Sequence, residues 1–337
     1  MNPENMQLWL ENLHSTKEKR SMPLLSFPSI SLLGCTVGEI TSNAELQAKG
    51  MKAVADAVPS LASVSFMDLS VEAEAFGANI AVSDTEVPSV ISTVVTDMAS
   101  AEALRVPTVG EKRTGVYVDA VKMAKQLILD RPVFAGIIGP FSLAGRLCDV
   151  TETLVYCYTD PDLLNVVLEK ATDFLVAYAK AYKAAGAQGV VMAEPLAGLL
   201  SPDLAEEFSE KYVKKIVDAV QDEHFLVVYH NCGNSAVQIA ESILRTGCAV
   251  YHFGNAIRME DMMQIFPEST IAMGNIDPAG EFKNGTPASM KQAVFTLLDE
   301  CGKYPNFVIS SGCDIPPDAK WENIHAYFNA INEYYKK

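Results

Sequence analysis

The runs GVVMA (residues 189–193) and FLVVYH (residues 225–230) decide the fold, because each has the length and apolar character of a strand buried on both faces. Between them, Ser201 and Pro202 open a segment whose apolar residues recur with helical spacing as far as Val220. A buried strand, a helix and a second buried strand form one parallel βα unit. The sequence therefore indicates an α/β protein with a parallel sheet.

Six further runs of the same kind occur along the chain. They are LASVSF (61–66), ANIAV (78–82), VFAGII (133–138), CAVYHF (248–253), TIAMG (270–274) and FVISSG (307–312). Eight buried strands that alternate with helices predict a closed (β/α)8 barrel, or TIM barrel, and such a barrel accommodates 337 residues as one unit. Because residues 1–60 lack a strong strand pattern, we expect them to form a helical N-terminal extension of a single domain spanning residues 1–337.

The overall charge limits the partners of the chain. Its 42 acidic residues against 26 lysines and arginines give a formal net charge of −16, which repels phosphate backbones and anionic lipids. We find no basic patch and no apolar stretch long enough to span a bilayer, so we expect neither nucleic acid nor a membrane as partner. Seven cysteines, without a C-x-x-C pair, indicate reduced thiols and a cytoplasmic protein.

A histidine and two cysteines fall where predicted strands end. His230 and Cys232 lie in HNCG after one strand, and Cys313 lies in SGCDIPP after the last strand. In a barrel the carboxyl ends of all strands meet at one mouth, so we expect the three side chains to converge there. One imidazole and two thiolates suit zinc, and three protein ligands leave a fourth position at which a substrate thiol would lose its proton.

The alternative is that these residues only pack in the core, because cysteine is a common core residue and an H-x-C triplet alone is a weak signal. The position of both motifs at strand ends favours the metal. Cys148, Cys157, Cys248 and Cys301 do not share this position, and we expect them to be core or surface thiols. His252, near another strand end, is expected to be packed or hydrogen-bonded rather than a ligand.

Three carboxylates are candidates for the reaction itself. Glu72 and Glu194 follow predicted strands, and either could serve as a fourth zinc ligand in the resting enzyme or accept the thiol proton. Glu74 falls on the same side as Glu72 if that segment is extended. A solvated loop charge or a helix cap is the alternative for these residues.

Four further charged residues are candidates for binding or orienting the substrate. Arg146 and Arg258 are the cations that could meet an anionic acceptor, although either could instead be a surface or interface arginine. Asp277, in GNIDP, and Asp314, beside Cys313, are expected to orient neighbouring groups at the site.

Five motifs give the chain a resemblance to a known family. They are SVEAEAFGA (70–78), GPFSLAG (139–145), HNCG (230–233), GNIDP (274–278) and SGCDIPP (311–317). In this order they resemble the uroporphyrinogen decarboxylase superfamily from about residue 61 onward, and EAEAFGA, HNCG and Cys313 resemble its methylcobamide:coenzyme M methyltransferase branch.

The resemblance implies a specific reaction. In that branch, zinc held by a His-x-Cys pair and a distant cysteine activates the thiol of an acceptor such as coenzyme M, and the thiol takes a methyl group from a methylcorrinoid on a partner corrinoid protein. The matching ligands here are His230, Cys232 and Cys313. The D-x-H-x-x-G pattern of corrinoid-binding modules is absent from the sequence, so we expect the corrinoid to come from a partner protein.

Two other functions compete with this one. The decarboxylase branch carries an R-Q-A-G-R type of motif that binds the carboxylates of the porphyrinogen, whereas this chain has RSMPLLSFPSISLLG (20–34) with Arg20 as its one cation. That difference disfavours porphyrinogen decarboxylation. The other alternative is a non-catalytic partner of a corrinoid protein, whose zinc site a fourth protein ligand would close.

Overall fold

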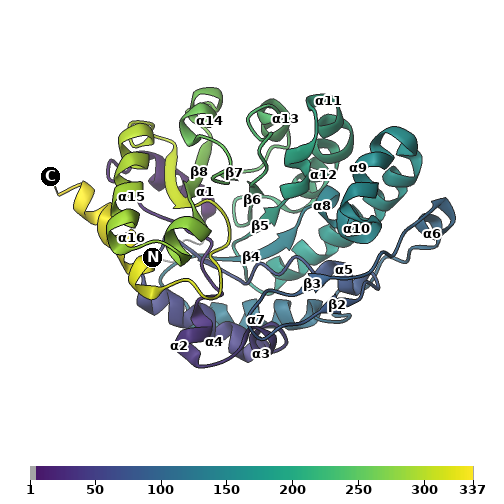
Figure 1. Ribbon diagram of the computed structural model, residues 1–337, viewed down its shortest axis with the longest axis horizontal. Coiled ribbons are helices and arrows are strands. Elements are labelled where there is room, and N and C mark those ends of the chain that lie inside the picture. Colours follow the sequence, from purple (N-terminus) through teal and green to yellow (C-terminus); the bar gives the residue numbers. More distant parts are fainter. Residues whose placement is uncertain (1–4, 337) are drawn as a thin grey trace.

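The computed structural model describes residues 5–336 and contains a curved sheet of seven parallel strands surrounded by helices (Figure 1). In sheet order the strands are β1 (Ser63–Val64), β4 (Val133–Ile138), β5 (Gly189–Ala193), β6 (Leu226–Asn231), β7 (Val250–Phe253), β8 (Ile271–Ile276) and β9 (Phe307–Ser311). Each strand pairs in parallel with the next. The predicted barrel architecture is thereby confirmed.

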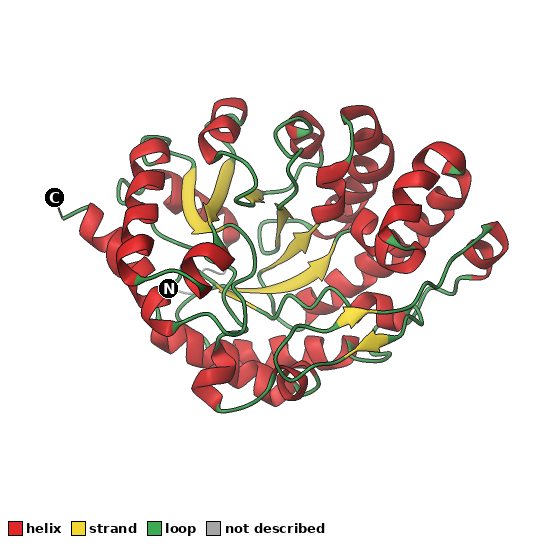
Figure 2. Ribbon diagram, viewed as in Figure 1, coloured by secondary structure: helices red, strands yellow, loops and turns green. Residues whose placement is uncertain are grey.

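Helices precede the first strand and connect the later ones, as Figure 2 shows in red. The N-terminal helices are α1 (Met6–Ser15), α2 (Ser29–Leu33), α3 (Val37–Thr41) and α4 (Ala44–Ala57), which confirms the helical N-terminal extension. The others are α5 (Val71–Ala75), α6 (Met98–Ala103), α7 (Thr114–Leu127), α8 (Pro140–Cys148), α9 (Val150–Thr159), α10 (Pro161–Ala184), η1 (Pro195–Leu199), α11 (Pro202–Ala205), η2 (Glu206–Glu210), α12 (Lys211–Val220), α13 (Ala240–Arg245), α14 (Met259–Ile265), η3 (Pro278–Lys283), α15 (Pro287–Cys301) and α16 (Trp321–Tyr334). Within residues 5–336, none of these helices has the length and apolar character needed to cross a bilayer.

The closing segment, residues 21–25, fills the eighth position of the barrel between β9 and β1. Ser21 forms a parallel bridge with Ile309, and the Met22 amide donates to the Ile309 carbonyl over 3.3 Å. On the other side the Leu61 amide, just before β1, donates to the Ser21 carbonyl over 2.8 Å. Pro23 has no amide hydrogen to donate, so the segment pairs only briefly and gives no strand signal in the sequence.

The prediction that residues 78–82 form a barrel strand is wrong. Ile80 and Ala81 form β2, which pairs antiparallel with β3 (Ser89–Val90) in a separate two-stranded sheet (Figure 2). Val82 is 61% exposed, so this run is not a core strand. A local hairpin satisfies its backbone hydrogen bonds instead. The prediction failed because ANIAV is too short for its apolar pattern to show whether the run is buried.

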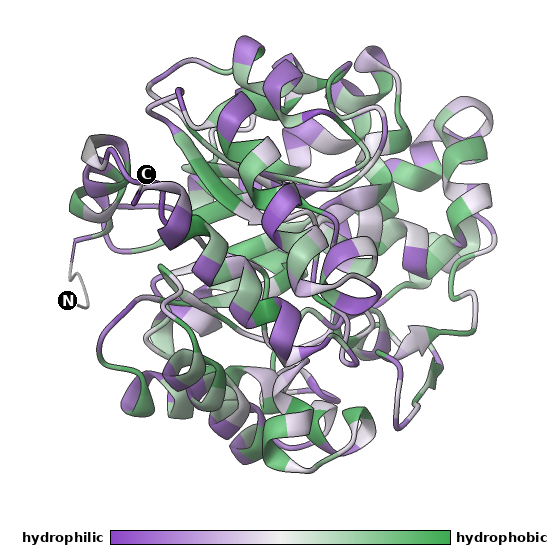
Figure 3. Ribbon diagram, turned by 60° about the vertical axis from the view of Figure 1, so that its left-hand side comes forward, coloured by the Kyte–Doolittle hydropathy of each residue, from purple (hydrophilic) through white to green (hydrophobic). Residues whose placement is uncertain are grey.

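Side chains alternate between the inside and the outside of the barrel, as successive residues of a strand must. In β5, Val191 packs with the interior cluster, whereas Val190 packs with the outer cluster under the helices. The interior cluster continues to α1, whose Trp9 ring lies 5.8 Å from that of Phe134, so α1 covers the amino-terminal end of the barrel. Figure 3 shows the resulting green, hydrophobic strands enclosed by helices of mixed colour. The opposite end is left for polar side chains.

Candidate active site at the barrel mouth

The alternation along β6 determines where His230 lies. Leu226 and Val228 point into the barrel, so His230, two residues further, points the same way and is only 2% exposed. Cys232 follows where the strand ends, and Cys313 lies two residues beyond the end of β9. The backbone around Cys232 needs glycine, since a Cβ on Gly254 would lie 2.5 Å from the Cys232 Cα.

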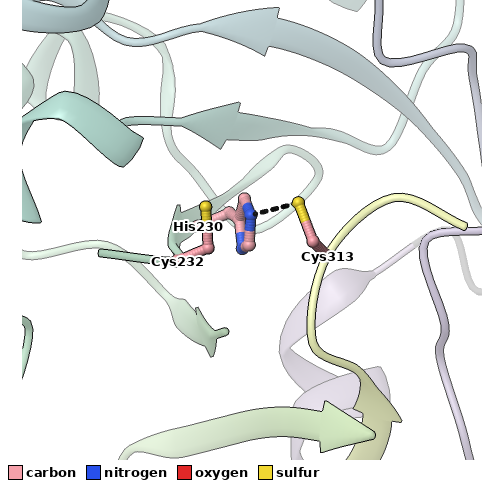
Figure 4. Close-up of side chains that lie close together, drawn as sticks. All are labelled: His230, Cys232 and Cys313. Carbon is pink, nitrogen blue, oxygen red and sulfur yellow. Dashed lines mark hydrogen bonds between the residues drawn. The ribbon is translucent and has the colours of Figure 1, made fainter. Parts of the chain in front are cut away.

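The structure brings the three predicted metal ligands together (Figure 4). Their donor atoms lie within 4.8 Å of one another, and the His230 Nε2 is 3.5 Å from the Cys313 Sγ. Tetrahedral zinc with ordinary bond lengths would separate its nitrogen and sulfur ligands by about 3.6 Å. The donor set and its spacing therefore fit a zinc ion.

One of the two thiols at the site, Cys232, differs from the buried cysteines elsewhere in acidity. The Cys232 pKa is lowered, chiefly because the Cys313 thiol hydrogen-bonds to its sulfur, and the Cys313 pKa is raised by the same contact and by burial. Burial raises the pKa values of Cys148, Cys248 and Cys301 to about 12, which makes these thiols inert. These three cysteines lie outside the group formed by His230, Cys232 and Cys313.

A second histidine lies directly behind the first. His252, on β7, is opposite His230 in the strand register, and their Nδ1 atoms are 2.8 Å apart. The His252 Nε2 lies 2.8 Å from the Ser310 Oγ, on β9. Burial lowers the His252 pKa well below its ordinary value, so this imidazole is neutral. The expectation that His252 is hydrogen-bonded is confirmed.

A mostly apolar cavity of about 410 Å³ adjoins the three predicted ligands. Its apolar walls come from the closing segment, the loop after β1, the β2–β3 hairpin and the loop after β9, through Leu24, Met67, Leu69, Val87, Pro88, Val90, Pro316 and Pro317. His230, Cys232 and Cys313 line it together with Arg146 and Asp314. The space is large enough for a small organic molecule in contact with the thiols.

The two candidate arginines occupy different environments. Arg146, in the last turn of α8, is partly buried and lines the same cavity as Cys232. Arg258 is 64% exposed, contacts Glu260 over 3.1 Å, and is not among the residues that line this cavity. Of the two, only Arg146 is placed to meet a ligand bound at the thiols.

Glu194 caps a helix. Its two carboxyl oxygens accept hydrogen bonds from the Phe141 and Ser142 amides, at the start of α8, over 2.8 and 3.0 Å, and Ser209 donates a third. A Cβ on Gly139 would lie 2.2 Å from this carboxyl group, so glycine is required there. Burial raises the Glu194 pKa to about 7. These contacts are those of a helix cap, the alternative expected for this residue. Glu194 is not in the group formed by His230, Cys232 and Cys313.

Glu72 is also buried and outside that group. One carboxyl oxygen accepts the Ile138 amide over 3.0 Å, and the other has no hydrogen-bond partner among the described residues. Burial raises the Glu72 pKa to about 7. Glu74, two residues on, forms an ion pair with Arg113 over 2.7 Å.

The two candidate aspartates, Asp277 and Asp314, lie in different environments. The Asp277 carboxylate accepts the amides of Ala279 and Gly280 over 2.9 and 2.8 Å and so caps η3. Asp314 lines the cavity, and burial raises its pKa well above the ordinary range. Its Oδ1 has no hydrogen-bond partner among residues 5–336. Asp314 is thus the one close to the thiols.

Sequence reasoning missed Arg113, which holds the loop after β1. Its guanidinium contacts Asp68 over 2.5 Å and the Ser70 hydroxyl over 2.8 Å, and Tyr117 donates to the same aspartate. This network fixes the wall of the cavity formed by Leu69 and Ser70. Arg113 begins a helix far from any predicted strand, so no local pattern marks it.

The fold and the site define a protein of the (β/α)8-barrel class with a group of polar side chains at the barrel mouth. Residues 29–334 match the family model described as uroporphyrinogen decarboxylase (URO-D). The chain therefore belongs to the uroporphyrinogen decarboxylase family.

Individual relatives divide between two activities. The chain is 30% identical over 277 residues to a methylcobamide:CoM methyltransferase, MtbA, of Methanosarcina acetivorans, with 79% of this chain and 78% of that protein covered. Its identity to MtbA of Methanosarcina mazei is 32% over 69% of each chain. Its identity to a uroporphyrinogen decarboxylase of Pseudoalteromonas translucida is 28% over 66% of this chain and 65% of that one.

Solved structures show the same fold. A methyltransferase from Methanosarcina mazei superimposes with a TM-score of 0.87 over 99% of this chain and 100% of that one, at 24% identity. A B12-independent methionine synthase from Shewanella superimposes with a TM-score of 0.61 over 94% of this chain and 95% of that one, at 12% identity. Both likenesses concern the fold alone.

Proposed function

We propose that this chain is a zinc-dependent methyltransferase that moves a methyl group from a methylcorrinoid on a partner protein to a small thiol. The observation that carries the proposal is the convergence of one imidazole nitrogen and two thiol sulfurs within 4.8 Å at the mouth of the barrel. The identity of about 30% to methylcobamide:CoM methyltransferases supports it.

His230, Cys232 and Cys313 would hold the metal and leave a position open toward the cavity. A bound zinc ion would lower the pKa of an incoming thiol, so that its sulfur is a thiolate at neutral pH. The apolar cavity walls exclude water from that sulfur and leave it poorly solvated, which increases its reactivity.

The transfer is a displacement at carbon. The thiolate sulfur attacks the methyl carbon, a carbon–sulfur bond forms, and the cobalt–carbon bond breaks with both electrons retained by cobalt, which goes from Co(III) to Co(I). The residues of the cavity contribute by holding sulfur and methyl in line, which makes the step effectively unimolecular. The partner must therefore present its corrinoid directly over the mouth.

Arg146 would determine which thiols are accepted. Among the described residues it is the one arginine or lysine that lines the cavity, which Cys232 also lines. An acceptor with a thiol at one end and an anionic group such as a sulfonate at the other would use both the sulfurs and this guanidinium. A single cation also disfavours a porphyrinogen, whose several carboxylates would need several cations.

The test is methyl transfer from methylcobalamin to a panel of thiols, with zinc content measured on the same protein. We expect about one zinc per chain and thiol-dependent loss of the methylcobalamin spectrum. Cys232→Ala and Cys313→Ala should lose zinc and activity, whereas Cys35→Ala, a partly exposed cysteine away from the cavity, should keep both. Undiminished turnover in both site variants would refute the proposal.

A further inference from the structure

A chain of buried hydrogen-bonding groups runs from the metal ligands to the closing segment. His230 Nδ1 is 2.8 Å from His252 Nδ1, His252 Nε2 is 2.8 Å from Ser310 Oγ, and Ser310 Oγ is 2.7 Å from the Met22 carbonyl oxygen. These four residues come from β6, β7, β9 and residues 21–25, and each is at most 2% exposed.

Strand alternation explains why these residues meet. Val228, Val250 and Val308 point into the barrel, so the residues two positions later on the same strands, His230, His252 and Ser310, form the next interior layer toward the mouth. In that layer polar groups replace aliphatic ones. This series of hydrogen-bonded groups is therefore one layer of the barrel interior.

The donor and the acceptor in each of these hydrogen bonds follow from the last group of the series, the Met22 carbonyl. A backbone carbonyl can only accept, so the Ser310 hydroxyl donates its single hydrogen to Met22. Its oxygen must then accept at the other contact, which places a hydrogen on His252 Nε2. The His252 ring is 1% exposed and hydrogen-bonds to no carboxylate among the described residues, so nothing there would offset the charge of a second ring hydrogen, and its Nδ1 accepts from His230 Nδ1–H.

The same reasoning fixes the remaining atom of His230. A histidine must be neutral to bind a metal, so a His230 ligand with its one hydrogen on Nδ1 would carry its lone pair on Nε2, the nitrogen that lies 3.5 Å from the Cys313 sulfur. A free neutral histidine prefers the opposite arrangement, with hydrogen on Nε2, which would block a metal there. The surroundings therefore select the less common tautomer.

We propose that His252 and Ser310 are positioning residues that hold His230 in the Nδ1–H tautomer and so present its Nε2 lone pair to a metal shared with the two thiols. The inference rests on the metal site of the proposed function. It assigns neither residue a contact with the metal or the substrate. Their effect is transmitted through the orientation and tautomer of one ligand, as outer hydrogen bonds do at metal sites generally.

The direct test is the tautomer itself, measured in the zinc-free protein by nitrogen-15 NMR of the histidine rings. The chain has five histidines, so the ring signals can be assigned one by one with single substitutions. We expect His230 to carry its hydrogen on Nδ1 and His252 on Nε2. A His230 ring with hydrogen on Nε2 would overturn the proposal.

Zinc affinity gives a second measurement, made by competition with a chromophoric chelator. His252→Phe removes the acceptor, and we expect zinc to bind about 10–100-fold more weakly. His252→Asn places an oxygen near the original Nδ1 and should restore most of the affinity, while Ser310→Ala should lie between. His325→Asn, an exposed histidine on α16, is the matched control and should bind zinc like the wild type.

Neither measurement depends on methyl transfer. A protein that binds zinc and shows the expected tautomer but transfers no methyl group would contradict the proposed function and leave this inference intact. Zinc binding in His252→Phe as tight as in the wild type would contradict the inference even in an active enzyme. If His252→Phe does not fold, the wild-type tautomer and Ser310→Ala still decide.

Discussion

The ends of β5 and β6 lie side by side, because Ala193 pairs with His230 in the strand register. Each strand delivers buried polar groups to the mouth of the barrel, but Glu194 uses both carboxyl oxygens on the α8 amides, whereas the His230 Nε2 and the two thiol sulfurs lie within 4.8 Å of one another. The comparison shows that position at a strand end does not by itself make a residue functional. The helix cap differs from the predicted ligands in that its polar atoms already have hydrogen-bond partners in the protein.

The largest effect should come from removing a ligand. Cys232→Ser should weaken zinc binding and methyl transfer by at least about 100-fold, because a neutral hydroxyl replaces a thiolate donor. The unfolding free energy of the zinc-free protein should change by less than about 1 kcal/mol, since this side chain is only partly buried. Chelator competition and denaturant unfolding measure the two quantities, and a large loss of stability would place Cys232 with the structural residues.

The opposite pattern is expected on the neighbouring strand. Glu194→Ala should lower the free energy of unfolding by about 2–4 kcal/mol, because it leaves two buried amides at the start of α8 without acceptors. Zinc affinity of the folded protein should stay within about twofold of the wild type. A selective loss of zinc without loss of stability would restore Glu194 as a predicted ligand.

Glu72, a second buried carboxyl group, should make the stability of the protein depend on pH. Its pKa is raised to about 7 by burial, above the value of 4.5 for an exposed glutamate, so the folded state holds this proton more tightly than the unfolded chain. The stabilisation is complete below about pH 4.5 and is lost as the pH rises through 7. Glu72→Gln keeps an oxygen for the Ile138 amide and cannot ionise.

Glu72→Gln should therefore match the wild type in stability at pH 5 and exceed it by about 1–3 kcal/mol at pH 8. Urea unfolding at the two pH values measures this difference. An equal stability difference at both pH values would show that ionisation of Glu72 does not contribute. Methyl transfer by the variant then reports whether Glu72 acts in the reaction, as its position in the sequence suggested.

The smallest effect concerns the two arginines. Arg146→Met should raise the KM for an anionic thiol about 10-fold and leave that for a neutral thiol unchanged, because one charged hydrogen bond is lost at the cavity. Arg258→Met, at an exposed ion pair, is the matched control and should change neither KM. Equal effects on both thiols would show that Arg146 shapes the cavity without selecting charge.

Much of the architecture could be predicted because long apolar runs identify buried strands, and seven of the eight predicted runs are in the barrel sheet. The eighth failed because a five-residue run such as ANIAV does not reveal its partner. The closing segment escaped because Pro23 limits its pairing to a bridge at Ser21.

The convergence of His230, Cys232 and Cys313 could be predicted from HNCG and SGC, which lie at the ends of strands. The hydrogen bonds of His252 could not, because its partners His230 and Ser310 come from other strands and the hydrogen-bond direction depends on the Met22 carbonyl. The helix-capping contacts of Glu194 and Asp277 likewise depend on where helices begin in space. Contacts between distant segments are what the linear pattern does not contain.

The seam between the closing segment and β9 also bears on how the protein is made. Met22 and Ser310 are 288 residues apart, so at a synthesis rate of about 5–20 residues per second the early segment waits roughly 15–60 s for its partner strand. Until then the apolar Met22 and Leu24 have no barrel interior to enter. The nascent chain should thus carry an incomplete barrel sheet on the ribosome, which chaperones can bind. The barrel should close only after the last strand has emerged.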